Sequence, residues 1–113
     1  MKKVEAIIRT EKLEDVKDAL VKNNLAKGLT VSQVLGHGTQ KGFPEFVRGQ
    51  EILTTLLAKV KLEIITTEDR AEKVAELIQK TARTGEVGDG KIFIYPIEQV
   101  IRIRTGETDE SAI

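Results

Sequence analysis

The sequence predicts an α+β domain with a ferredoxin-like βαββαβ sandwich, in which two helices cover one face of a sheet. Four segments alternate apolar and polar residues with the two-residue period of a strand, and two segments repeat apolar residues with the period of a helix. Along the chain they follow in the order strand, helix, strand, strand, helix and strand. Because 113 residues leave room for only one core, residues 1–113 are expected to form a single domain.

Residues 4–9 form the first predicted strand, in which Val4, Ala6 and Ile8 point to one side. Thr10 is expected to cap the helix that follows. The apolar stripe of this helix consists of Leu13, Val16, Ala19 and Leu20. Gly28 lies beyond the predicted end of the helix, where a turn leads into the next strand.

The second half of the predicted sandwich begins with strands over residues 29–37 and 60–65. Thr66 and Thr67 precede the second helix, whose inner stripe is Ala71, Val74, Leu77, Ile78 and Thr81. A fourth strand over residues 92–95 and a short last strand over residues 101–104 complete the prediction, with a tail to residue 113.

Residues 83–91, here called the glycine loop, carry Gly85, Gly88 and Gly90, followed by Lys91. Glycines free the backbone to turn its N–H groups toward an anion, and the lysine adds a cation, so the loop is suited to phosphate. The run fits G-x-x-x-x-G-K, but Ile92 stands where a P-loop has Ser or Thr, and the segment leads from a helix into a strand. The alternative is a plain turn in which Asp89 and Gly90 supply positive φ angles.

The last predicted strand favours the anion site over the plain turn. Period-two alternation is expected to turn Ile101 and Ile103 to the core and Arg102 and Arg104 to the other face. Two guanidinium groups on one face suit a polyphosphate.

Residues 38–58, here called the effector loop, interrupt the sheet between the second and third predicted strands. Loops of this length usually have a function or are disordered. Its apolar side chains either meet a protein partner or fold back on the domain: they are Phe43, Phe46, Val47, Ile52, Leu53, Leu56 and Leu57. At the base of the loop, Gln40, Lys41 and Gly42 leave one strand where Lys59 enters the next, so an amide oxygen and two ammonium groups converge.

Two helices can cover only one face of the predicted sheet. The other face still carries apolar residues such as Ile7 and Ile65. We therefore expect oligomerisation to cover it.

Composition narrows the classes of function. Lys and Arg number 18, as do Asp and Glu, so the net charge is zero and general nucleic-acid binding is disfavoured. The absence of cysteine excludes disulfides, thiolate nucleophiles and cysteine-based zinc sites. No apolar run predicts a signal peptide or membrane insertion, and we expect a cytoplasmic protein.

Six segments of the chain together resemble the nitrogen regulatory PII family. They are VEAIIR, LTVSQV, GHGTQKG, RGQE, KVKLEI and ARTGEVGDGKIFIYPIEQVIRIRTGE. The last segment is long and specific, and the resemblance spans nearly the whole chain.

This resemblance implies a homotrimer that binds ATP or ADP in each cleft between subunits. It implies that Gly88, Asp89, Gly90 and Lys91 hold phosphate, opposed by Arg102 and Arg104 of the neighbour. It also implies that Gly36, His37 and Gly38 back the nucleotide. Thr30 and Glu63 would lie near its base and ribose.

The resemblance further implies 2-oxoglutarate as an effector. Gln40 would ligate Mg²⁺ bridging ATP and 2-oxoglutarate, and Lys59 would pair with the far carboxylate of the acid. Lys41 and Gly42 would complete the pocket. The implied protein partner would meet the effector loop; candidates are an ammonium transporter, glutamine synthetase or another nitrogen enzyme.

At several positions the chain departs from the family pattern. Ile52 and Gln50 occupy the positions of the modified tyrosine and serine of some relatives, so those modifications are not expected. Thr39 stands where an arginine commonly contacts nucleotide and His37 where an aromatic residue is common, which bears on the balance between ATP and ADP. No pairing of nucleophile and base predicts an enzyme.

Two alternatives stay open at this point. One is a PII-like trimer that senses adenylates but regulates carbon metabolism or membrane transport through another effector. Gln40 and Lys59 argue against it, since such a protein needs neither. The other is a trimeric metal-handling protein of similar fold, disfavoured by a single histidine and no cysteine.

Overall fold

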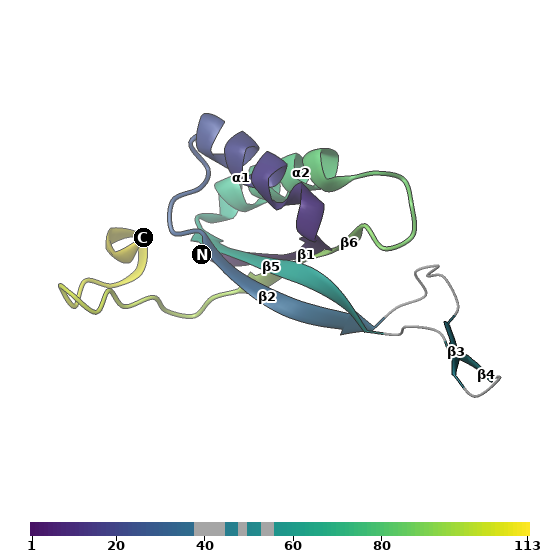
Figure 1. Ribbon diagram of the computed structural model, residues 1–113. Helices are drawn as coiled ribbons and strands as arrows, with labels where there is room; N and C mark the ends of the chain where they lie inside the picture. Colours follow the sequence, from purple (N-terminus) through teal and green to yellow (C-terminus); the bar gives the residue numbers. More distant parts are fainter. Residues whose placement is uncertain (38–44, 48–49, 53–55) are drawn as a thin grey trace.

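The computed structural model describes residues 1–37, 45–47, 50–52 and 56–113, with side chains described for 1–37 and 56–113. Its main sheet is antiparallel with the strand order β2-β5-β1-β6, and two helices lie on one face (Figure 1). The strands of this sheet are β1 (Lys2–Arg9), β2 (Thr30–His37), β5 (Leu56–Thr66) and β6 (Gly90–Pro96). Within the effector loop, β3 (Glu45–Val47) pairs with β4 (Gln50–Ile52). The predicted α+β fold with βαββαβ order is confirmed.

The helices begin differently from each other. A 3₁₀ turn, η1 (Thr10–Lys12), precedes α1 (Leu13–Lys22), whereas α2 (Glu68–Ala82) follows Thr67 directly. The prediction that Thr10 caps the first helix is wrong: its hydroxyl donates to Oε2 of Glu11 at 3.3 Å. Because the extra turn moves the start of α1 to Leu13, the cap position falls on Lys12, which makes no side-chain capping bond.

The core lies between the helices and the facing side of the sheet. Cross-strand pairs Val4↔Ile64, Ala6↔Leu62 and Ile8↔Val60 supply its floor. Burying one such aliphatic side chain contributes about 1.5–3 kcal/mol. The helices complete the core with Val16, Leu20, Ala71, Val74, Ile78 and Ala82, while Leu13 and Leu77 are only partly buried against it.

Strand β5 begins earlier than its apolar pattern indicates. Leu56, Leu57 and Ala58 pair with His37, Gly36 and Leu35, so they belong to the sheet. The predicted boundary of the effector loop at residue 58 is therefore wrong. The pairing of β2 with β5 continues toward the loop beyond Val60, the core residue of β5 that lies nearest to it. Backbone pairing extends β2 and β5 beyond the residues whose side chains are buried in the core.

The helix-free face of the sheet carries both apolar and charged side chains. Ile7 and Ile65 are half-buried there, and Phe93 remains 41% exposed. Glu5 accepts a hydrogen bond from the Tyr95 hydroxyl at 3.0 Å, and Lys3 lies 4.5 Å from the centroid of the Tyr95 ring. In a single chain this face has no covering layer among the described residues (Figure 1).

The predicted last strand over residues 101–104 is not formed. Ile101 makes one isolated bridge, to Thr108, and Ile103 is fully exposed. The chain turns back instead: Arg102 N–H donates to Glu107 C=O and Gly106 N–H donates to Arg102 C=O, both at 2.8 Å. Within the described part of the chain the segment joins no sheet, because Pro96 ends β6 and Gly106, at φ +72°, permits the turn.

The chain ends in η2 (Asp109–Ala112), another 3₁₀ turn. Among the helices that the structure describes, none combines the length and apolar character needed to span a bilayer.

Candidate functional site

A hollow of about 410 Å³ lies where the ends of β2, β5 and β6 meet the glycine loop. It is lined by Ile7, Gly36, His37, Leu57, Lys59, Val87, Gly88, Gly90, Lys91 and Phe93. Its volume falls within the range of small-molecule sites, about 300–1,000 Å³. Six of the predicted binding residues are thus brought together: Gly36, His37, Lys59, Gly88, Gly90 and Lys91.

The glycine loop crosses the end of β1 with a backbone that glycine alone adopts easily. Gly85, Gly88 and Gly90 have φ angles of +90°, +101° and +103°. A Cβ atom on Gly90 would lie 1.7 Å from the carbonyl oxygen of Ile7, so the loop backbone touches β1 directly. Asp89 is not among the residues with positive φ, so the plain turn with positive angles at both Asp89 and Gly90 is wrong.

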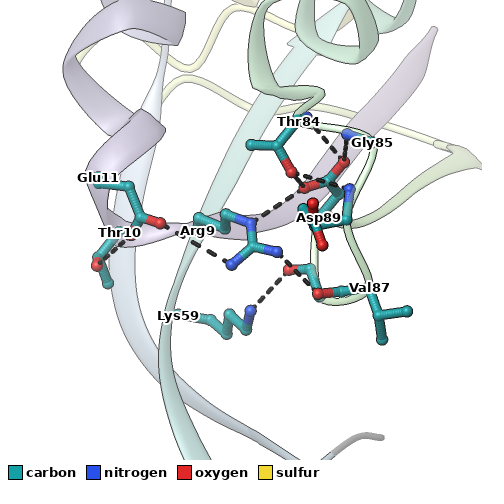
Figure 2. A network of polar contacts seen from close by, with 10 residues as sticks. Arg9, Thr10, Glu11, Lys59, Thr84, Gly85, Val87 and Asp89 are labelled. Atoms are coloured by element: carbon teal, nitrogen blue, oxygen red, sulfur yellow. Dashed lines mark hydrogen bonds and ion pairs between the residues drawn. The ribbon is translucent and has the colours of Figure 1, made fainter. Parts of the chain in front are cut away.

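Asp89 holds the glycine loop together with its side chain, as Figure 2 shows. One carboxylate oxygen, Oδ2, accepts from Thr84 N–H at 2.8 Å and from Gly85 N–H at 2.9 Å. The other, Oδ1, accepts from the Thr84 hydroxyl. These bonds, led by the hydroxyl of Thr84, hold the pKa of Asp89 far below its usual range. The carboxylate is therefore engaged within the loop, and only the backbone of Asp89 could meet a phosphate.

Two cationic side chains of the sheet bind the glycine loop. Arg9 and Lys59 are directly paired across β1 and β5. Arg9 donates from Nε to Oδ1 of Asp89 at 3.0 Å and from Nη2 to the carbonyl of Val87 at 2.8 Å. Lys59 donates from Nζ to the carbonyl of Gly88 at 2.7 Å. Like charges directly opposite each other repel, so the loop oxygens offset the repulsion within this pair.

The two lysines of the hollow have different surroundings. Burial, followed by the nearby Arg9 guanidinium, lowers the pKa of Lys59. Lys91, on the exposed edge strand, makes no ion pair with any other side chain that the structure describes. Its ammonium is available to an anionic ligand.

The remaining predicted residues lie farther along the sheet or at its other end. Thr30 and Glu63 are a cross-strand pair on the helix-free face, and Glu63 is four residues along β5 from Lys59, about 13 Å. Arg102 lines a separate hollow, of about 420 Å³, and pairs with Glu107 at 3.4 Å. The turn that carries Arg102 and Arg104 lies at the opposite end of the molecule from the glycine loop (Figure 1). One chain therefore does not bring these arginines to its own glycine loop.

The other predicted contacts fall on Gly38, Thr39, Gln40, Lys41 and Gly42, which lie outside the described residues. The assignments of a Mg²⁺ ligand and an acid pocket to them stay predictions. Among the described residues, no three His, Cys, Asp or Glu side chains are grouped to hold a metal ion.

Sequence reasoning missed Arg9 and the role of the Asp89 carboxylate. Arg9 occupies the last position of an alternating strand, where an exposed charge is ordinary. Only the β1–β5 register, which sets Arg9 opposite Lys59, and the glycine loop above them reveal its partners.

Comparison with known proteins places this sequence in a family. The family model described as Nitrogen regulatory protein P-II matches residues 1–107. A Nitrogen regulatory protein P-II of Nostoc punctiforme is 54% identical over 113 residues, and one of Pasteurella multocida is 50% identical over the same length. Nitrogen regulatory protein P-II 1 of Escherichia coli is 48% identical. Each alignment covers 100% of this chain and 100% of the relative.

Proposed function

This chain belongs to the P-II family of nitrogen regulatory signal transducers, and we propose that it senses ATP or ADP together with 2-oxoglutarate. The observation that carries the proposal is the hollow that joins Lys59, Lys91 and the glycine loop. These groups come from two strands and a loop, and they share one property: each can donate N–H hydrogen bonds to the oxygens of an anion, and the two lysines also neutralise its charge.

The phosphates of the nucleotide are assigned to the glycine loop and Lys91. Positive φ angles at Gly88 and Gly90 give the backbone the freedom to present N–H groups, and the Lys91 ammonium has no competing carboxylate among the described residues. The base and ribose are assigned to Thr30 and Glu63, farther along the helix-free face.

The 2-oxoglutarate site is assigned beside the phosphates, at Gln40 and Lys59, completed by Lys41 and Gly42. Two anions bind side by side only where cations neutralise them, so we propose Mg²⁺, held by Gln40, between ATP and the acid. ADP, lacking the third phosphate, would not build this second site. The two ligand states would bias the effector loop by their difference in affinity for its conformations.

Arg102 and Arg104 require a second copy of the chain. Since the turn that carries them lies at the opposite end of the molecule from the glycine loop, they would complete the phosphate site of a neighbour in a homotrimer (Figure 1). The same association would cover Phe93 and Ile103, which a single chain leaves 41% and 100% exposed.

The output of the sensor is proposed to be contact between the effector loop and a protein of nitrogen metabolism in the cytoplasm. An ammonium transporter, glutamine synthetase or another nitrogen enzyme or regulator is the class of target. Proteins of this family are regulators, and we assign no catalytic residue to the chain.

Calorimetric titration tests the proposal. We expect 2-oxoglutarate to bind in the presence of Mg²⁺ and ATP, and not with Mg²⁺ and ADP or without nucleotide. Gln40→Ala should abolish binding of the acid and leave most of the ATP affinity, while Gln33→Ala, an exposed glutamine on β2, should change neither.

Two outcomes would contradict the assignment. Equal loss of ATP and acid binding in Gln40→Ala would refute the role of Gln40. ATP binding by the wild type without any response to 2-oxoglutarate would favour the adenylate sensor with a different effector.

A further inference from the structure

Arg9 contacts the glycine loop in a way that bears on the direction of its backbone groups. The guanidinium donates at once to the carboxylate of Asp89, at 3.0 Å, and to the carbonyl of Val87, at 2.8 Å (Figure 2). Its side chain is only 13% exposed, and that of Asp89 is 24% exposed. A planar fork held at two points in a half-buried setting fixes the position of the loop more firmly than a single exposed contact does.

The carbonyl contacts determine where the neighbouring N–H groups point. In a trans peptide the C=O of one residue and the N–H of the next point in opposite directions, and this chain has no cis peptide bond among the described residues. Because Arg9 holds the Val87 carbonyl, the N–H of Gly88 is turned away from the sheet cations. Lys59 holds the Gly88 carbonyl and so turns the N–H of Asp89 in the same manner.

The Asp89 carboxylate extends this control to the start of the loop. It binds the N–H groups of Thr84 and Gly85 and the Thr84 hydroxyl on one side, and Arg9 on the other. The loop between residues 84 and 89 is therefore closed on itself and attached to β1 through one residue. Arg9 itself is not among the residues that line the hollow.

We propose that Arg9 is a positioning residue of the phosphate site, which orients the backbone N–H groups of the glycine loop through Asp89 and the Val87 carbonyl without touching the ligand. This inference rests on the proposed binding of ATP. Its specific content is that the geometry of the guanidinium fork, and not its positive charge, supports phosphate binding.

Arg9→Lys separates geometry from charge. Lysine keeps the positive charge, but a single ammonium cannot reproduce the planar fork toward a carboxylate and a carbonyl. We expect Arg9→Lys to weaken ATP binding about tenfold and to leave adenosine binding within about twofold of wild type. Arg70→Lys is the matched control and should change neither affinity, since the hydrogen bond of Arg70 within the described part of the chain goes to the Asn24 carbonyl, away from the glycine loop.

A double-mutant cycle with Asp89→Asn tests the route of the effect. If Arg9 acts through Asp89, the Asp89→Asn and Arg9→Lys losses should overlap, so that the double variant binds ATP about as weakly as either single variant. Thermal unfolding of each variant checks that it is folded, and Asp89→Asn carries the comparison of ATP with adenosine if Arg9→Lys does not fold.

The outcomes are distinguishable. Wild-type ATP affinity in Arg9→Lys would show that charge suffices and would overturn the inference. Equal losses for ATP and adenosine, or losses that multiply in the double variant, would overturn it as well. Failure of the wild type to bind ATP would instead overturn the proposed function, and this inference with it.

Discussion

At residue 90 the backbone passes so close to β1 that a Cβ atom would lie 1.7 Å from the carbonyl oxygen of Ile7. Gly90 also has a φ of +103°, where residues with side chains are strained. It is the first residue of β6 and the last glycine of the loop, so one position serves both the fold and the site. Any side chain here must displace β6 from β1 or reshape the loop.

We predict that Gly90→Ala destabilises the protein more than an alanine at another glycine of positive φ. Gly28 has a φ of +75° and open space around its missing Cβ, so Gly28→Ala measures conformational strain alone, about 1–2 kcal/mol. Gly90→Ala adds a backbone clash to that strain. Urea unfolding of both variants checks the difference, and equal free energies of unfolding would show that the contact with Ile7 relaxes at no cost.

Lys59 provides a prediction of pH dependence. On its proposed role the ammonium form pairs with a carboxylate of 2-oxoglutarate, so the acid should bind best below the pKa of Lys59 and lose affinity as pH rises through it. Burial and the neighbouring Arg9 lower that pKa below the ordinary lysine value of 10.5. The loss should therefore begin at a lower pH than an exposed lysine would give.

Calorimetry with Mg²⁺ and ATP at several pH values between neutral and alkaline would measure this dependence. Lys59→Arg is the control, because a guanidinium remains charged throughout that range and should flatten the profile if the variant still binds the acid. A wild-type affinity that is constant or rises with pH would contradict the assigned pairing.

At the scale of elements, sequence reasoning succeeded where burial leaves a period in the sequence. The alternation of Val4, Ala6 and Ile8 and the helical spacing of Ala71, Val74 and Ile78 predicted faces that are buried in the structure. It failed at Ile101 and Ile103, whose alternation has the same form but belongs to a turn that pairs with no strand among the described residues. A periodic pattern predicts that a face will be covered, and it does not identify which chain covers it.

The candidate site could be predicted only in part, because the sequence shows residue types and spacing but not the contacts between distant segments. Glycines, lysines and their spacing are visible in the sequence, and the structure gathers Gly88, Lys91 and Lys59 around one hollow. The contacts that organise the loop are not visible, because the bond from Arg9 to Asp89 joins residues 80 positions apart through the register of β1, β5 and β6. Register depends on the whole sheet and cannot be derived from a local pattern.

At the scale of the whole molecule, the two faces of the sheet differ in how far they are buried. The helices bury the core on one face, while the helix-free face and the C-terminal segment leave apolar surface, with Ile101 59% and Ile103 100% exposed. Contiguous exposed apolar surface is typical of association surfaces. The proposed trimer would cover such groups and bring the arginines of the same segment to a neighbouring glycine loop.

Mixed oligomers give a direct test of this arrangement. Lys91→Ala removes the cation of the glycine loop, and Arg102→Ala with Arg104→Ala removes the opposing guanidiniums, so each variant alone should bind ATP weakly in every cleft. In a ring assembled at random from equal amounts of both, a cleft is intact only when its loop comes from the arginine variant and its arginines come from the Lys91 variant. This is the case for about one quarter of the clefts. We expect titration of such co-refolded rings to recover about that fraction of sites with wild-type affinity, after mass spectrometry has established that both variants share one oligomer.

If shared oligomers recover no strong site, the arginines do not complete the cleft of a neighbour, because two chains that each carry one defect can restore a site only by dividing it between them.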